Sequence, residues 1–383
     1  MQVAHLSLTD FRNYSAVEVP FARGFNLFVG RNGQGKTNLI EAIGYLSTLG
    51  SHRVSSDQAM IRQGAESAII RAQIQHGERQ ILAEVQLNRA APNRAQINRS
   101  AIRARELPRY FASVLFAPED LALVRGDPAG RRRFLDELMC LRIPRYVGVM
   151  TDYERVVKQR NSLLKTARAS RVSAENLSTL AIWDDHLISL GSEIVMGRQN
   201  LVAELTPELS RAYFSVAGED HQPLIAIHST LSLDRSAAEN FGASSTLALI
   251  AEQFSAKLQT VQRAEVERAI TLVGPHRDDL VLSLNDMPAK GYASHGESWS
   301  FALALKLAAA QLLRQESTTG DPVVILDDVF AELDRARRFR LAEAIVGFEQ
   351  VLITAAVLED VPGDLVGHTV HINRGRIGEQ GGQ

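Results

Sequence analysis

"GRNGQGKT", Gly30 to Thr37, stands between the short apolar run "FNLFV" and a stretch whose apolar residues recur at helical spacing. It matches the phosphate-loop pattern G-x-x-x-x-G-K-[ST] in full. Glycines here let backbone N–H groups close around phosphates, and the following helix turns the positive end of its dipole toward them. Because strand, loop and helix follow one another as this chemistry requires, the stretch predicts a nucleotide site and not a chance match in a surface loop.

The residues of this loop have distinct uses toward a bound nucleotide. Lys36 supplies a positive charge to the β- and γ-phosphates and thereby assists catalysis, and Thr37 offers its hydroxyl to Mg²⁺. The predicted nucleotide contacts are Gly30, Arg31, Asn32, Gly33, Gln34, Gly35, Lys36, Thr37 and Asn38.

A phosphate loop requires an acid on a neighbouring strand to hold the metal. The apolar run "VVIL" leads into Asp327 and Asp328. Asp327 is the predicted Mg²⁺ ligand beside Thr37, and Asp328 stands where a catalytic base positions water against the γ-phosphate. A pair of acids that only ends a strand is the alternative, and it loses most of its weight once Lys36 is accepted as a phosphate ligand.

A long helical region separates the two halves of this site. Residues from about 130 to 268 have helical periodicity, as in "WDDHLISLGSEIVMGRQNLVAEL". Strand patterns precede it in "VAHLSL", "AIIRAQIQ" and "QILAEVQL", and return in "DDLVLSLN", "PVVILDD" and "QVLITAA". The chain resembles a split ABC-type ATPase head, which implies ATP and an α/β fold. We expect a mixed sheet with an antiparallel N-terminal part and an inserted helical arm. The predicted domains are 1–125 (head with the phosphate loop), 126–268 (arm) and 269–383 (head with the acid strand).

"YASHGESWSFALALKL", Tyr292 to Leu307, places Ser294 and Gly296 directly before an Ala/Leu-rich helix. ABC-type heads carry a Ser-x-Gly loop at this place. By that resemblance, the loop holds the γ-phosphate of ATP bound to a second copy of the chain, so that ATP joins two copies head to tail. The alternative is that Ser294 caps the helix and does nothing more.

Composition limits the compartment and the class of protein. Of 383 residues, 45% are apolar and 22% are charged, which is ordinary for a globular protein. No run approaches the roughly 20 apolar residues of a membrane span, the N-terminus lacks a signal-peptide pattern, and Cys140 is alone. We therefore expect a cytoplasmic protein that has no membrane partner.

Two clusters of arginine stand out against a net charge of only −2. Residues 89–109 contain six arginines and one acid, and "GRRRF" places three arginines side by side. A solvated face and a phosphate-binding patch both explain them, and charge alone favours the solvated face at about two to one. The predicted DNA-contacting residues are Arg94, Arg99, Arg103, Arg131, Arg132 and Arg133.

Over essentially its whole length the chain resembles the bacterial RecF family of DNA replication and repair proteins. The matching stretches are "FRNY" (Phe11 to Tyr14), "GRNGQGKT", "PEDLALVRGDPAGRRRFLD" (Pro118 to Asp136), "GPHRDDL" (Gly274 to Leu280) and "ILDDVFAELDRARRFRL" (Ile325 to Leu341). The second and the last recur in many ATPases, whereas the arginine stretch and "GPHRDD" are specific.

The resemblance implies an ATP-dependent DNA-binding protein of recombinational repair and replication. It implies action at single-strand gaps or their junctions, with RecO and RecR, to help RecA load, and support of the SOS response. It also implies that Asp334 contacts nucleotide at the opposite subunit. "GPHRDD" has no chemical role that its residues reveal, and a structural salt-bridge cluster explains it as well as a site does.

Two departures from the family pattern bear on activity. Glu297, Ser298 and Trp299 follow Gly296 where the family usually reads Gln-Gln-Arg. Asp328 is one methylene shorter than the Glu of many transporter ATPases, which favours slow, DNA-stimulated hydrolysis, with ATP as a clamp timer.

Two other classes of protein contain the same type of ATPase head. A chromosome-organising clamp requires much longer heptad segments than 130–268 provides, and a transporter energy subunit would lack both the arginine stretch and the arm. Stimulation of ATP turnover by DNA, and not by membranes, distinguishes these readings.

Overall fold

The computed structural model describes residues 1–170, 178–231 and 243–378, which belong to two compact units. Unit 1 comprises Met1–Arg125, Pro207–Leu224 and Leu284–Gln383, and unit 2 comprises Gly126–Thr206 and Ile225–Ser283. Unit 1 therefore draws on both ends of the chain, as the split site requires.

Unit 1 contains an antiparallel sheet of six strands in the order β2-β1-β4-β5-β6-β7. Buried and half-buried residues alternate along β4, because one face packs on the core and the other meets solvent. The predicted hairpin of β4 and β5 is confirmed and turns at Gly77, whose φ of 58° suits glycine. The strands are β1 (Gln2–Phe11), β2 (Tyr14–Pro20), β4 (Ser67–His76), β5 (Arg79–Asn88), β6 (Arg94–Ile97) and β7 (Ser100–Ile102).

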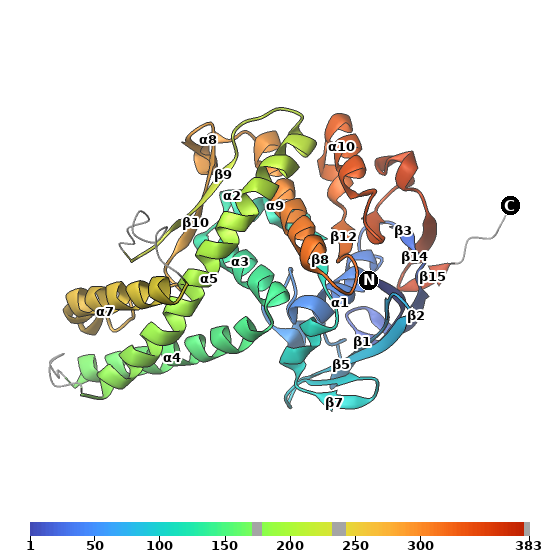
Figure 1. Cartoon of the computed structure of the whole chain (residues 1–383). Helices are drawn as coiled ribbons and strands as arrows, with labels where there is room; N and C mark the ends of the chain where they lie inside the picture. Colours follow the sequence, from blue (N-terminus) through green and yellow to red (C-terminus); the bar gives the residue numbers. More distant parts are fainter. Residues whose placement is uncertain (171–177, 232–242, 379–383) are drawn as a thin grey trace. The chain divides into compact units, whose positions relative to one another are not determined.

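The second sheet of unit 1 has the order β15-β14-β3-β13-β12-β8, and all neighbours are parallel except β14 and β15. Every residue of β12 and β13 is buried, as expected for parallel strands covered on both faces. In Figure 1 the blue strand β3 lies with the orange-red strands of the C-terminal part. The strands are β3 (Gly24–Val29), β8 (Ser113–Phe116), β12 (Val323–Asp327), β13 (Gln350–Ala355), β14 (His368–Asn373) and β15 (Arg376–Gly378).

The helices of unit 1 bury apolar stripes on these sheets. The side chains of Leu39, Ile43 and Leu46 on α1 are wholly buried in the core with residues of both sheets. Most residues of α9 between Ser298 and Leu313 are buried, so its alternating leucines belong to a core helix, as predicted. The helices are α1 (Lys36–Thr48), α2 (Leu121–Arg125), α8 (Ala289–Tyr292), α9 (His295–Glu316) and α10 (Arg335–Ile345), and β11 (Met287–Pro288) is a two-residue strand.

Unit 2 is mainly helical and is held together by a buried ionic network. The Arg160 and Glu265 side chains are wholly buried and lie 2.6 Å apart, and Arg160 also donates to Asp184 at 2.7 Å. Buried charges of this kind persist only when they are paired. The elements are α3 (Pro128–Arg142), α4 (Arg145–Ala169), α5 (Ser178–Ala217, to Thr206 in this unit), α7 (Ala243–Arg268), β9 (Leu224–His228) and β10 (Asp279–Leu284).

The boundaries of the helical arm differ from the predicted 126–268. The first boundary falls between Arg125 and Gly126, but unit 2 continues to Ser283 and excludes Pro207–Leu224. The end of α5 belongs to unit 1 because Glu208 accepts a hydrogen bond from Gln315 at 2.9 Å, and the Ala217 carbonyl accepts one from Arg340 at 2.6 Å. None of the described helices is long and apolar enough to cross a membrane.

Candidate nucleotide site

The phosphate loop links β3 to α1, as predicted. Gly33 and Gly35 have φ of 79° and 116°, a left-handed conformation that side chains with a Cβ rarely adopt. Helix α1 begins at Lys36, and its N-cap residue, Gly35, provides no side-chain cap. The first N–H groups of the helix therefore lack a side-chain acceptor, which suits an anion.

Lys36 lies inside this loop and is only 3% exposed. Its Nζ donates to the Gly30 carbonyl oxygen at 2.7 Å and lies 3.9 Å from Asp328 Oδ1. It also donates, at 3.5 Å each, to the Arg31 carbonyl and to Asn32 Oδ1, both in the loop itself. An ammonium group held mainly by neutral oxygens of the loop can transfer its hydrogen bonds to a phosphate.

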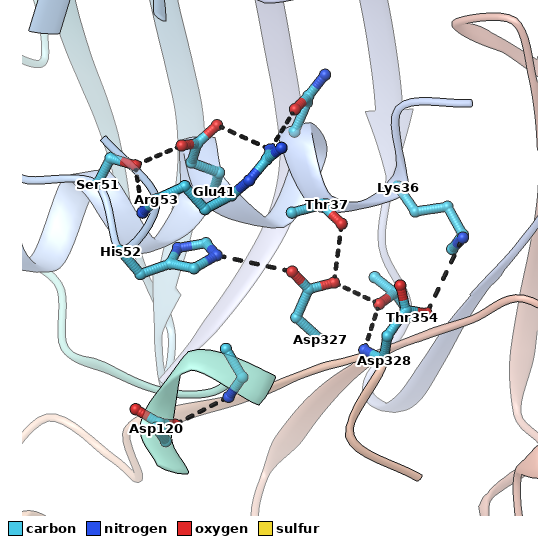
Figure 2. Close-up of polar contacts among 12 residues, drawn as sticks. Lys36, Thr37, Glu41, Ser51, His52, Arg53, Asp120, Asp327, Asp328 and Thr354 are labelled. Atoms are coloured by element: carbon cyan, nitrogen blue, oxygen red, sulfur yellow. Dashed lines mark hydrogen bonds and ion pairs between the residues drawn. The ribbon is translucent and has the colours of Figure 1, made fainter. Parts of the chain in front are cut away.

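Thr37 and Asp327 meet, although they are 290 positions apart in the sequence. Thr37 Oγ1 donates to Asp327 Oδ1 at 3.1 Å, and Thr354 Oγ1 on β13 donates to the same oxygen at 2.7 Å (Figure 2). A hydroxyl and a carboxylate are the hard oxygen ligands that Mg²⁺ takes from a protein. The described residues contain no group of three or more His, Cys, Asp or Glu that could hold a metal, so Mg²⁺ here would depend on phosphate and water for its other ligands.

Asp328 follows Asp327 in a left-handed conformation, with φ of 50°. Its backbone N–H donates to Thr354 Oγ1 at 2.9 Å, which fixes the turn. Its Oδ1 is buried and has no hydrogen-bond partner within the described part of the chain. Burial raises the pKa of the Asp328 carboxyl, and the nearby Lys36 partly opposes this. An unsatisfied acceptor of raised basicity beside the loop is suited to orienting a water molecule.

The side chains of the "FRNY" stretch hold the phosphate loop and the start of α1 by hydrogen bonds. Their residue types did not reveal this role. Asn13 Nδ2 donates to the Gln34 carbonyl at 3.4 Å, and the Tyr14 hydroxyl donates to the Gly35 carbonyl at 3.0 Å. Arg12 Nε donates to Glu41 on α1 at 2.8 Å. Three consecutive side chains therefore hold the loop and the helix that follows it.

The other predicted loop contacts divide between exposed and supporting positions. Arg31 and Asn32 are exposed. Gln34 Oε1 accepts the Arg374 N–H at 2.5 Å, so its side chain anchors the loop. The Asn38 side chain, predicted to contact nucleotide, instead donates to Asn13 at 2.8 Å and accepts from Arg53 at 2.9 Å.

Ser294 is the N-cap of α9 and forms a capping box with Glu297. Its Oγ accepts from the Glu297 N–H at 3.2 Å, and its own N–H donates to Glu297 Oε2 at 2.7 Å. These hydrogen bonds lower the pKa of the Glu297 carboxyl. Glu297, which departs from the family pattern, therefore stabilises the start of the helix. The capping role of Ser294 is real, and its contact with a partner's phosphate stays a prediction.

Arg337 links this loop to Asp334. Its guanidinium lies against Gly296, where an added Cβ would come within 2.7 Å of Nη2. It donates through Nε to Ser300 at 3.0 Å and forms an ion pair with Asp334, the N-cap of α10. Ser294, Gly296 and Asp334 are thus gathered at the starts of α9 and α10.

"GPHRDD" forms the centre of unit 2, which favours the structural reading. Its residues hold partners from four other segments of that unit. The contacts are Arg198 Nη1 to the Pro275 carbonyl at 2.7 Å, Tyr153 to His276 at 2.8 Å, Arg277 to the Thr271 carbonyl at 3.0 Å, the Thr230 N–H to Asp278 at 2.8 Å, and Arg131 to Asp279 at 2.7 Å.

We expect His276 to make the stability of unit 2 depend on pH. Burial lowers the pKa of His276 to about 4, from an ordinary 6.5. Between these values the unfolded chain binds a proton that the folded chain does not, so stability is complete above about pH 6.5 and falls with pH. The expected loss from His276 between pH 7 and pH 5 is about 2 kcal/mol. Urea unfolding at both pH values measures it, and His276→Gln should remove that share. An equal loss in both proteins would contradict the assignment.

The predicted DNA-contacting arginines fall into two groups. Arg94, Arg99 and Arg103 are exposed along the β6–β7 edge of the antiparallel sheet. Arg131 is only 5% exposed and binds both oxygens of Asp279, so its side chain is inside unit 2 and unable to meet a DNA phosphate. Its prediction was wrong, because the run of three arginines lies on a helix of which one face is buried. Arg132 donates to the Asp278 carbonyl at 2.7 Å, and Arg133 is exposed and paired with Glu137.

The mixed sheet carries a phosphate loop and, at the end of a neighbouring strand, two carboxylates. A second helix begins at a loop that contains Ser294 and Gly296. Together these features define a P-loop ATPase head of the ABC type. In agreement, a sequence model of the RecF/RecN/SMC N terminal domain matches residues 2–361.

The chain belongs to the RecF family. It is similar to the DNA replication and repair protein RecF of Leifsonia xyli subsp. xyli, with 62% identity covering 99% of this chain and 100% of that one. The corresponding protein of Clavibacter sepedonicus is 60% identical over 99% of this chain and 95% of its own. Among solved structures, the recombination mediator protein RecF-ATPrS in the RecFOR pathway matches with a TM-score of 0.85 and 27% identity over 98% of this chain and 97% of that chain. The resemblance seen in the sequence is confirmed.

Proposed function

We propose that this chain is an ATP-gated DNA-binding protein of recombinational repair and replication, which binds ATP with Mg²⁺ at the phosphate loop. The observation that carries the proposal is the convergence of Lys36, Thr37, Asp327 and Asp328 on one loop of unit 1. Lys36 holds the β- and γ-phosphates, and Thr37 and Asp327 hold the metal, which neutralises phosphate charge when bound. Asp328 accepts the proton of the attacking water.

ATP in this proposal joins two copies of the chain. Ser294 and Gly296 contact the γ-phosphate on the partner, and Asp334 lies at the same contact. The support is that Ser294 begins α9 and that Arg337 donates to Ser300 of this helix while it pairs with Asp334, so the starts of α9 and α10 lie together. ATP hydrolysis then releases the pair and times its residence on DNA.

The biological setting follows from the family. RecF-ATPrS has been solved as a recombination mediator in the RecFOR pathway. We therefore propose that this chain acts in the cytoplasm at single-strand gaps or their junctions, with RecO- and RecR-like partners, to help RecA load and to support SOS induction.

DNA contact in this proposal uses the exposed arginines of the β6–β7 edge, with Arg132 and Arg133 as further candidates. Arginine on an exposed edge binds the phosphate backbone with little sequence preference. Neutralising each phosphate releases counterions, so the affinity falls steeply as salt rises.

Replacing Arg94, Arg99 and Arg103 together by Glu is expected to weaken DNA binding at least about tenfold at 0.1 M salt and to reduce the salt slope by about 2 to 3. Fluorescence anisotropy with a gapped duplex, ATP and Mg²⁺ measures both quantities. The matched control replaces Arg155, Arg211 and Arg263 by Glu, since their side chains are 68%, 68% and 92% exposed and belong to the helices α4, α5 and α7. An unchanged salt slope in the first variant would contradict the assignment.

A further inference from the structure

His52 lies in the loop that follows α1, and this loop is firmly anchored on both sides. Ser51 donates to Glu41 at 2.5 Å, and its Oγ accepts the N–H groups of Arg53 at 3.0 Å and Val54 at 3.1 Å. The imidazole between these anchors is only 16% exposed and points toward Asp327 (Figure 2). The sequence around it forms no recognisable motif, so its position comes from the fold alone.

The two oxygens of Asp327 differ in their surroundings. Oδ1 accepts hydrogen bonds from Thr37 and Thr354, at 3.1 and 2.7 Å. Oδ2 faces the His52 side chain, whose Nε2 lies 3.7 Å away. That nitrogen is itself buried and has no hydrogen-bond partner within the same residues. The gap exceeds an ordinary N–H···O distance by only about 0.8 Å.

We propose that His52 is a positioning residue for the metal site: its Nε2–H donates to Asp327 Oδ2 and holds the carboxylate so that Oδ1 and the Thr37 hydroxyl face Mg²⁺ together. The proposal rests on the proposed binding of ATP with Mg²⁺. Mg²⁺ demands near-ideal octahedral geometry, so the orientation of its protein ligand matters. Partners that orient a metal-binding side chain typically change metal affinity 10- to 100-fold when they are removed.

The placement of His52 distinguishes this role from simple packing. A residue that only filled space would be apolar, since a buried nitrogen without a partner is unfavourable. Here the unpartnered nitrogen faces the one carboxylate oxygen that the two threonines leave free.

The test compares His52→Ala with His52→Gln, whose side-chain amide places an N–H donor at a similar reach. A fluorescent ATP analogue is bound to each full-length protein, first in EDTA and then with increasing Mg²⁺ at constant pH. We expect His52→Ala to raise the Mg²⁺ concentration at half-effect about 10- to 100-fold. Nucleotide affinity in EDTA should stay within about twofold, and His52→Gln should recover the native midpoint to within about threefold.

Three other results would each have a different meaning. An unchanged Mg²⁺ midpoint in His52→Ala overturns the inference and leaves the proposed function standing. An equal loss of affinity with and without Mg²⁺, in both variants, also overturns it, because that pattern belongs to a structural residue. Failure of the native protein to bind the nucleotide at all contradicts the proposed function. His186→Ala, at an exposed position of unit 2, controls for loss of an imidazole, and thermal unfolding confirms that each variant is folded.

Discussion

Replacing Lys36 by Met is expected to lower ATP affinity at least about 100-fold, or about 2.8 kcal/mol, and to abolish ATP-dependent DNA binding. Hydrogen bonds to charged groups contribute about 1.5–3 kcal/mol each, and Lys36 is proposed to bind two phosphates. Met keeps most of the length and volume of the buried side chain, so the loop should keep its packing while it loses the charge.

The measurement is a titration of native and variant protein with a fluorescent ATP analogue, followed by anisotropy with gapped DNA. Lys165→Met is the matched control, because Lys165 is exposed on α4 in unit 2 and the substitution is the same. Affinity within about threefold of native in Lys36→Met would mean that the loop does not hold the phosphates. DNA-stimulated ATP turnover should also be lost in Lys36→Met, because the variant no longer binds ATP.

Ser294→Arg is expected to have the second large effect, the loss of ATP-induced pairing. The substitution removes the N-cap of α9 and places a long side chain where a partner's γ-phosphate would sit. Loss of the cap costs about 1 kcal/mol, which a helix whose middle part is packed in the core tolerates. The expected loss of pairing therefore arises at the subunit contact and not from unfolding.

Local patterns in the sequence were enough to predict the nucleotide site and its sheet. The glycine spacing, Lys36 and Thr37 occupy one short loop, and the wholly apolar run before Asp327 could only be a strand covered on both faces. Long-range pairing then followed from chemistry, because a phosphate loop requires a carboxylate on an adjacent strand.

What the sequence did not reveal depends on partners far along the chain. Arg131 has the appearance of a surface charge until Asp279, 148 positions away, is placed beside it. His52 has no pattern of its own, and only the fold directs it to Asp327. Arg337 reaches Ser300 from a different helix. For the same reason, the sequence did not indicate that "GPHRDD", which has no helical periodicity, belongs to the same compact unit as the helices before it.

The central claim is that ATP gates pairing of two copies through the start of α9, and molar mass tests it most directly. Light scattering is run on native protein, Ser294→Arg and Thr318→Arg, each with and without Mg²⁺ and a slowly hydrolysed ATP analogue. Thr318 is exposed just beyond the other end of α9, so its substitution matches in size and charge. Nucleotide is expected to double the mass of the native protein and of Thr318→Arg and to leave the mass of Ser294→Arg unchanged. A native mass that nucleotide leaves unchanged, or a Ser294→Arg mass that doubles, would contradict this pairing.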